Sequence, residues 1–299
     1  MPVAAPSYTE EVERLDVGDP ESVPVRDAAT VMLVRDAAEG IEVCMLRRHL
    51  QSGFVGGAYV FPGGAVDAGD HSSGINEVSR ISPEAGRPAG AASVIAFEVA
   101  AIREAFEEAG ILLAYDRGGE LVTFEDQEVD ERFSDHRGAL HRGERGLEEI
   151  CRGESLTLAV DRLRYVSRWV TPLGSPRRFD TRFFVAAAPP GQEPLHDDIE
   201  VIENLWIVPE EALARHGSGR MPMILPTVRS LEFLGGFGSV DELLTTAADI
   251  EVVEPVRPRV EGHRDGERIV LPDGEAFDAE TSRPTGQDWS SGGNVGHAP

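Results

Sequence analysis

The sequence predicts an α/β or α+β sandwich, a domain in which a sheet and helices share a core. Apolar runs rich in β-branched residues alternate with amphipathic segments of helical period between about residues 24 and 250. The chain has 299 residues, 41% of them hydrophobic, which is enough for one large core or two modest ones. We find no internal repeat, so each element is considered in turn.

The first part of the chain contains three predicted strands. A polar, proline-containing lead-in over residues 1–23, expected to be flexible, precedes them. Two apolar runs, AATVMLVRD and IEVCMLRRH, flank AAEG and predict a β-hairpin. A short strand over Ala58–Phe61 is ended by the sequence PGG. Residues 67–92 show no period and predict a loop.

A helix is predicted from about Val94 to Ala109, with Ser93 as its N-cap and Gly110 after its last turn. At about 100° per residue, its apolar side chains form one arc. The opposite side carries a charged group, which consists of Arg103, Glu104, Glu107 and Glu108. Carboxylates at the C-terminal end of a helix face the negative end of its dipole, which costs roughly 0.3–1 kcal/mol each.

The remaining chain predicts further helices and strands. The charged, weakly periodic sequence at about 118–154 predicts short helices of an inserted helical lid. SLTLAVDRLRY predicts a helix, whereas VSRWV, RRFDTRFFVAA and IEVIENLWIV predict strands. PEEALARHG, LPTVRSLEFLGGF and VDELLTTAA predict helices. Residues 251–299 are expected to form a small β extension and, from about Glu280, a disordered tail.

Composition limits the classes of function. The net charge is −25, and a chain this acidic is repelled by a phosphate backbone, so we expect no nucleic-acid partner. Two cysteines, Cys44 and Cys151, are too few for a disulfide framework and fit a reducing compartment. The N-terminus does not resemble a signal peptide, and no apolar run approaches the roughly 20 residues that cross a bilayer. We therefore expect a cytoplasmic protein without a membrane partner; the oligomeric state stays open, with a homodimer as one option.

Three glutamates at the end of the predicted helix suggest a metal site. Residues three and four apart on a helix are neighbours, so Glu104, Glu107 and Glu108 aim at one volume. At about 4 Å and an effective dielectric constant of about 20, each like-charged pair costs about 4 kcal/mol before screening. Mg²⁺ or Mn²⁺, which prefer oxygen ligands, would offset that repulsion and keep positions open for phosphate. The alternative is a solvated acidic face on an amphipathic helix.

The residues around these glutamates resemble the Nudix box, G-x5-E-x7-R-E-U-x-E-E-x-G-U, in which U is apolar. Gly64 matches its first glycine, Asp70 stands where its first glutamate is expected, and REAFEEAGI matches its second half. The spacing differs, because the 32 residues 71–102 stand where the box has seven, with the insertion placed at 71–92. A box split in this way, together with GFVGGAYVFPGG, RWVTP and RRFDTRFF, is similar to the coenzyme A diphosphatase branch of the Nudix hydrolases.

This resemblance implies a Nudix α/β/α sandwich over residues 24–250, with a mixed sheet between helices. It also implies a metal-dependent pyrophosphatase that cleaves the diphosphate bond of a small-molecule nucleoside diphosphate derivative. The first choice of substrate is coenzyme A or an acyl-coenzyme A, cleaved to 3′,5′-ADP and (acyl) 4′-phosphopantetheine. Two alternatives are hydrolysis of ADP-ribose or another dinucleotide, and a non-catalytic Nudix-like module that binds a nucleotide.

The resemblance further implies roles for the residues of the box. Glu104, Glu107 and Glu108 would hold the metal ions, and Glu107 would belong to the catalytic group. Arg103 would belong to it too, by orienting a box glutamate through a charge-assisted hydrogen bond. Asp70 has one methylene fewer than glutamate, and a loop role for it is an equal alternative.

Residues outside the second half of the box complete the expected site. The general base is expected at Glu200 of IEVIENLW, chosen over Glu203 by its distance from the tryptophan in that branch. Gly63 and Gly64 would bring the backbone close to metal and phosphate. Arginines are the candidates to meet substrate phosphates: Arg47, Arg48, Arg177 and Arg178.

Overall fold

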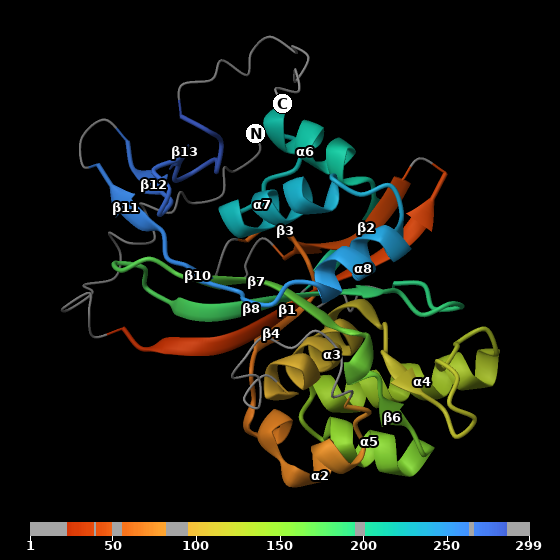
Figure 1. Cartoon of the computed structure of the whole chain (residues 1–299). Helices are drawn as coiled ribbons and strands as arrows, with labels where there is room; N and C mark the ends of the chain where they lie inside the picture. The colour runs from red at the N-terminus through yellow and green to blue at the C-terminus, as the bar shows by residue number, and fades with distance from the viewer. Residues whose placement is uncertain are drawn as a thin grey trace.

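The computed structural model describes residues 23–38, 40–49, 56–81, 95–194, 201–262 and 266–285. Within these ranges, one central sheet is built from β1 (Val25–Ala37), β2 (Gly40–Arg48), β3 (Tyr59–Val60), β4 (Gly63–Ala65), β7 (Arg164–Val170), β8 (Arg178–Ala187), β9 (Val201–Ile207) and β10 (Pro255–Val256). Neighbouring strands follow the order β10-β7-β8-β1-β2-β3, while β4 pairs with β1 and β9 pairs with β2 (Figure 1). The sheet is mixed, because β1 runs parallel to β8 and antiparallel to β2.

Helices cover both faces of this sheet (Figure 1). One face carries α2 (Ser73–Glu77), α3 (Ile95–Ala109), α4 (Gln127–His141) and α5 (Leu147–Glu154). The other face carries α6 (Pro209–Gly217), α7 (Leu225–Leu234) and α8 (Val240–Ala248). The predicted α/β/α sandwich is confirmed. No helix in the described part of the chain is long and apolar enough to pass through a lipid bilayer.

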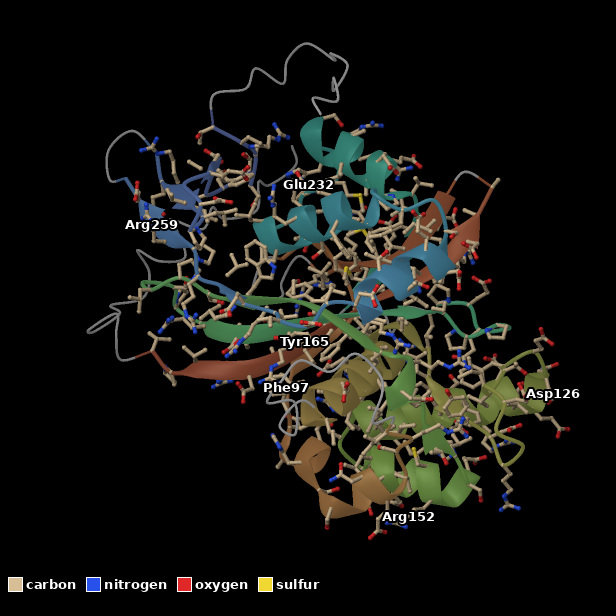
Figure 2. The ribbon with its side chains drawn as sticks, in the orientation of Figure 1. Phe97, Asp126, Arg152, Tyr165, Glu232 and Arg259 are labelled. Carbon is tan, nitrogen blue, oxygen red and sulfur yellow. The ribbon has the colours of Figure 1, made fainter. Side chains whose placement is uncertain are left out.

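The alternation of side chains along β1 explains why the sheet is buried on both faces. Ala29, Val31 and Leu33 belong to a core that contains the apolar side of α3. Met32 and Val34 belong to a second core, formed with residues of α6, α7 and α8. Successive side chains of a strand point to opposite faces, so a continuous apolar run fills both cores at once. Figure 2 shows side chains occupying the space on both sides of the sheet.

The segment SLTLAVDRLRY is extended, so the predicted helix is wrong. Thr157–Leu158 forms β6, which pairs with β5 (Ala114–Tyr115), and one 3-10 turn over Val160–Arg162 leads into β7. The amide of Leu158 bonds to the carbonyl of Val78 at 2.7 Å. Hydrogen bonds to distant backbone groups therefore replace the helical ones, and the apolar spacing of this segment fits either conformation.

The two predicted insertions contain helices. In the described part of residues 67–92, predicted as a loop, a 3-10 helix η2 (Ala68–His71) precedes α2, and the Ser72 hydroxyl caps α2 by accepting from the amide of Ile75 at 3.0 Å. Segment 118–154 contains α4 and α5, which contribute buried apolar residues to the first core, while its lid role stays a prediction. Several predictions fall on ranges outside the described residues: 1–22, 82–94 with Ser93, 195–200 with Glu200, and 286–299.

A second antiparallel sheet follows the main one, formed by β11 (Arg259–Glu261), β12 (Arg268–Val270) and β13 (Ala276–Asp278). We call it the C-terminal sheet; Figure 1 shows it in blue, on the same side of the main sheet as α7. It is fixed to the domain because Leu271 and Phe277, which are 4% and 3% exposed, belong to the second core. β10, just before it, pairs with β7 and so extends the main sheet.

Candidate functional site

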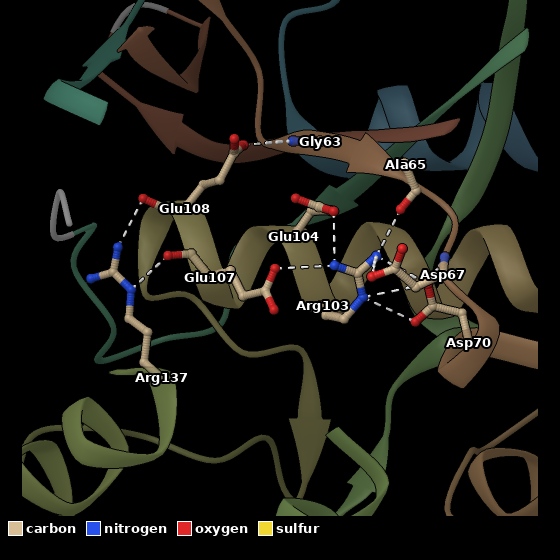
Figure 3. A network of polar contacts seen from close by, with 9 residues as sticks. All are labelled: Gly63, Ala65, Asp67, Asp70, Arg103, Glu104, Glu107, Glu108 and Arg137. Atoms are coloured by element: carbon tan, nitrogen blue, oxygen red, sulfur yellow. Dashed lines mark hydrogen bonds and ion pairs between the residues drawn. The ribbon is translucent and has the colours of Figure 1, made fainter. Parts of the chain in front are cut away.

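Gly110 and Arg137 donate hydrogen bonds to carbonyl groups at the C-terminal end of helix α3. Gly110 has a φ of +70°, in the left-handed region, and its amide bonds to the carbonyl of Phe106 at 3.0 Å. Arg137 of α4 donates to the carbonyl oxygens of Glu107 and Glu108 at 2.8 and 2.9 Å (Figure 3). Its positive charge therefore lies at the negative end of the helix dipole, beside the carboxylates. The sequence does not predict this contact, because about 30 residues separate Arg137 from Glu107 and no local pattern links them.

Arg103 is the centre of a buried polar network (Figure 3). Its Nη1 donates to Glu104 at 2.8 Å and to Glu107 at 3.0 Å. Its Nε and Nη2 donate to the two carboxylate oxygens of Asp70 at 3.1 and 3.0 Å, and Nη2 also donates to the carbonyl of Ala65 at 2.8 Å. Burial lowers the pKa of Arg103, but the hydrogen bond to Asp70 and the surrounding carboxylates outweigh it, so the pKa is raised and the charge is kept.

Asp70 is held as a partner of Arg103. It is 3% exposed and lies in η2, where its carboxylate also accepts a hydrogen bond from the amide of Asp67 at 2.8 Å. Residues 70 and 103 are therefore in contact although the inserted segment separates them in sequence. Asp70 therefore forms an ion pair with Arg103, the arginine of the box. It does not line the cavity described below.

The two glycines of β4 lie close to β1 and to the carboxylates of α3. The amide of Gly63 donates to Glu108 at 2.9 Å. A Cβ atom at Gly64 would lie 2.6 Å from the Glu104 carboxylate, and one at Gly63 would lie 2.5 Å from the backbone oxygen of Ala29. The two glycines thus allow the backbone to reach the carboxylates, as the sequence predicts.

We expect the Gly63→Ala substitution to lower the free energy of unfolding by about 1–3 kcal/mol, because the new methyl group meets the backbone of β1. Urea unfolding measures the change. Gly69→Ala is the matched control, because no atom lies within 4 Å of a Cβ atom at Gly69. Equal stabilities of the two variants would contradict the close approach of β4 to β1.

Burial and mutual repulsion make the ionised form of the carboxylates in this network less favourable. Burial raises the pKa of Glu104 to about 7, against the lowering effect of Arg103 and with added repulsion from Glu107. Burial likewise raises the pKa of Glu107, again opposed by Arg103. One guanidinium thus faces more carboxylates than it neutralises, and a further cation would be favourable here.

The donor set fits a divalent cation. Glu104, Glu107 and Glu108 supply carboxylate oxygens from one helix, the ligand type that Mg²⁺ and Mn²⁺ prefer. In the structure, Arg103 engages two of these carboxylates and the amide of Gly63 engages the third. Within the described ranges, no group of three acidic, histidine or cysteine side chains is already gathered around one ion position.

A cavity of about 710 Å³ lies beside this network. Its walls include Glu104, Glu107 and Glu108 together with both glycines of the loop. Besides Arg103, three arginines line it: Arg48 at the end of β2, Arg26 in β1 and Arg177 before β8. The Nε of Arg48 is buried and has no hydrogen-bond partner in the described part of the chain. The sequence does not predict Arg26 and His141, which also line the cavity, because neither belongs to a motif. Arg26 reaches the cavity from β1, and His141 reaches it from the end of α4.

Two of the predicted arginines point elsewhere. Side chains alternate along β2, so Arg47 lies away from the cavity walls, 3.6 Å from Glu203 and over the ring of Tyr59 at 5.6 Å. Arg178 donates to the carbonyl of Thr171 at 3.3 Å and does not line the cavity. Both are tied to partners within the fold.

The predicted general base, Glu200, lies outside the described residues. Its alternative, Glu203, accepts a hydrogen bond from the hydroxyl of Tyr59 at 2.9 Å. Glu203 does not line the cavity; its hydrogen bond with Tyr59 links β3 and β9, which both pair with β2.

The fold and the box together define a class of protein. A family model described as the NUDT19 Nudix domain matches residues 79–233, which are 155 of the 299 residues. The chain belongs to the Nudix family, and within that family its match is to this NUDT19 domain.

Known proteins agree with this assignment. The acyl-coenzyme A diphosphatase NUDT19 of Xenopus laevis is 30% identical over 68% of this chain and 62% of its own length, and the human protein of the same name is 28% identical over 69% and 64%. The chain thus spans less than two thirds of these two relatives. A crystal structure of a Nudix hydrolase from Alicyclobacillus acidocaldarius superposes with a TM-score of 0.65 at 30% identity, covering 75% of this chain and 97% of that one.

Proposed function

We propose that the protein hydrolyses the diphosphate bond of coenzyme A or an acyl-coenzyme A, giving 3′,5′-ADP and (acyl) 4′-phosphopantetheine. The observation that carries this proposal is the cluster of three glutamates on the wall of a cavity that Arg103 and three further arginines also line. The relatives named acyl-coenzyme A diphosphatase support the choice of substrate.

Glu104, Glu107 and Glu108 are the residues that would hold the divalent cation, for which we propose Mg²⁺ or Mn²⁺. When bound, such a cation offsets charge on phosphoryl oxygens and makes a water molecule more acidic. The Nudix family generally uses divalent metal ions, which supports this assignment.

The protein's own groups position the substrate and the carboxylates. Arg103, fixed by Asp70, holds the carboxylates of Glu104 and Glu107 in place before substrate binds. Arg48 can donate to an anionic diphosphate oxygen, because it lines the cavity and its guanidinium carries several N–H groups. Glu200 remains the proposed general base on the sequence alone.

The cytoplasm is the compartment that we propose. Both cysteines of the chain, Cys44 and Cys151, are free and buried, and burial raises the pKa of each thiol to about 12. Such thiols are unreactive structural residues, as in proteins of reducing compartments.

A panel of substrates tests the activity. With Mg²⁺ or Mn²⁺ the protein should cleave coenzyme A and acetyl-coenzyme A faster than ADP-ribose or NADH, and EDTA should abolish turnover. The products are resolved chromatographically. No turnover of any of the four compounds would contradict a hydrolase and favour a nucleotide-binding module. Preference for ADP-ribose would contradict the choice of coenzyme A.

A further inference from the structure

The cavity extends well beyond the carboxylates, to the C-terminal sheet. One stretch of its wall comes from residues after position 257: Pro258, Val260, Ile269, Ala279 and Ser282. None of these five side chains is charged. The acidic residues that line the cavity come only from the loop before η2 and from α3. The carboxylates therefore line one part of the cavity, whereas the wall at the C-terminal sheet carries no charged side chain.

The main sheet supplies an apolar surface to the same cavity. Side chains two residues apart lie on the same face of a strand, so Phe179 and Phe183 of β8 face the cavity together. Thr30 of β1 is the partner of Phe183 in the parallel register, and Trp169 of β7 is the partner of Thr181 on the other side of β8. Trp169 and Phe183 are 8% and 5% exposed, so this surface is sheltered from water.

The C-terminal sheet is held in place by specific contacts. Nη2 of Arg283, just after β13, donates to the carbonyl of His216 in α6 at 2.9 Å. Ile269 packs against the second core, to which Leu271 and Phe277 belong. This wall lies outside residues 79–233, the part of the chain that matches the Nudix domain model. It is thus a feature of this chain in addition to the matched domain.

We infer that Val260, Ile269 and Ala279 of the C-terminal region, with Trp169 and Phe183 of the main sheet, form a subsite for the acyl chain of the substrate. This inference rests on the proposed function, because the same cavity would hold the diphosphate beside α3. The uncharged wall at the C-terminal sheet suits the acylated end of the molecule, whereas the end lined by the carboxylates of α3, which would hold a divalent cation, suits its phosphates. Each methylene group that becomes buried should raise the affinity by up to about fourfold.

The test compares kcat/KM for octanoyl-coenzyme A with that for coenzyme A. The unaltered protein should prefer the octanoyl compound, and Ile269→Asn should lower that preference at least tenfold, since it places an amide in the apolar wall. Ala279→Trp, which fills the subsite, should act in the same direction. Arg268→Gln is the matched control, because Arg268 precedes Ile269 in β12 but is exposed and does not line the cavity. It should leave both values unchanged, and thermal unfolding checks that each variant is folded.

Binding separates this inference from the proposed function. Octanoyl-pantetheine and acetyl-pantetheine contain no diphosphate, so their dissociation constants do not depend on hydrolysis. The octanoyl compound should bind at least tenfold more tightly, and Ile269→Asn should remove that difference. Equal binding of the two compounds, or the same preference in all variants, would overturn the subsite. Failure to cleave coenzyme A while the binding difference persists would contradict the hydrolase and leave the apolar subsite supported.

Discussion

Replacing Glu107 with glutamine is expected to lower kcat on coenzyme A by roughly 10²–10⁴-fold while the fold stays intact. Glu107 lines the cavity and accepts a hydrogen bond from Arg103 at 3.0 Å. Glutamine keeps the size of the side chain and an oxygen that can accept this bond. It removes the negative charge that would hold a divalent cation, so the loss should appear in turnover and in Mn²⁺ affinity together. Chromatography measures the first quantity and electron paramagnetic resonance the second.

Glu128→Gln is the matched control for Glu107→Gln, because it removes the same charge from an exposed position at the start of α4. It should leave both turnover and Mn²⁺ affinity unchanged. Circular dichroism and urea unfolding compare the folds of the two variants. If Glu107→Gln turned over coenzyme A at a rate within about threefold of the unaltered protein, the carboxylate cluster would not be the metal site.

The part of the site that sequence could predict is the part that depends on local spacing. Glu107 and Glu108 lie three and four residues after Glu104, so a helix places all three on the same side, at its C-terminal end, wherever it packs. Gly110 ends α3 as predicted, because a left-handed residue after a helix favours glycine. The hairpin of β1 and β2 and helices α6 and α8 were predictable for the same reason, because a short, continuous stretch of sequence carries the whole pattern of each.

Other features depend on contacts between distant segments. Arg137 reaches the end of α3 from another helix, and nothing in its neighbours distinguishes it from the other arginines of segment 118–154. SLTLAVDRLRY has apolar spacing that fits a helix or a strand, and hydrogen bonds to residues far away in the sequence decide between them. The wall formed by the C-terminal sheet could not be predicted either, because Val260 and Ile269 reach the cavity only once that sheet packs on the second core.

Removing the guanidinium group of Arg103 should lower the free energy of unfolding by about 3–5 kcal/mol. Asp70 is 3% exposed and receives two N–H groups from Arg103, at 3.1 and 3.0 Å. Without the N–H groups of Arg103, the buried carboxylate of Asp70 still accepts a hydrogen bond from the amide of Asp67 but has no cationic partner. The Arg103→Met variant retains an unbranched apolar side chain of similar reach, so the change isolates the charge. Urea unfolding of both chains gives the difference in free energy.

A second substitution separates the charge pair from the packing. Adding Asp70→Asn to Arg103→Met removes the stranded charge, so the double variant should recover part of the lost stability. Arg152→Met is the control, because Arg152 is 48% exposed and pairs with Glu77 on the surface, where ion pairs contribute about 0–1 kcal/mol. Losses of similar size at Arg103 and Arg152 would mean that the buried pair does not hold the two halves of the box together. A loss several times larger at Arg103, partly restored by Asp70→Asn, would show that this pair joins the two halves of the box across the inserted segment. That connection keeps the glutamates of α3 facing Gly63.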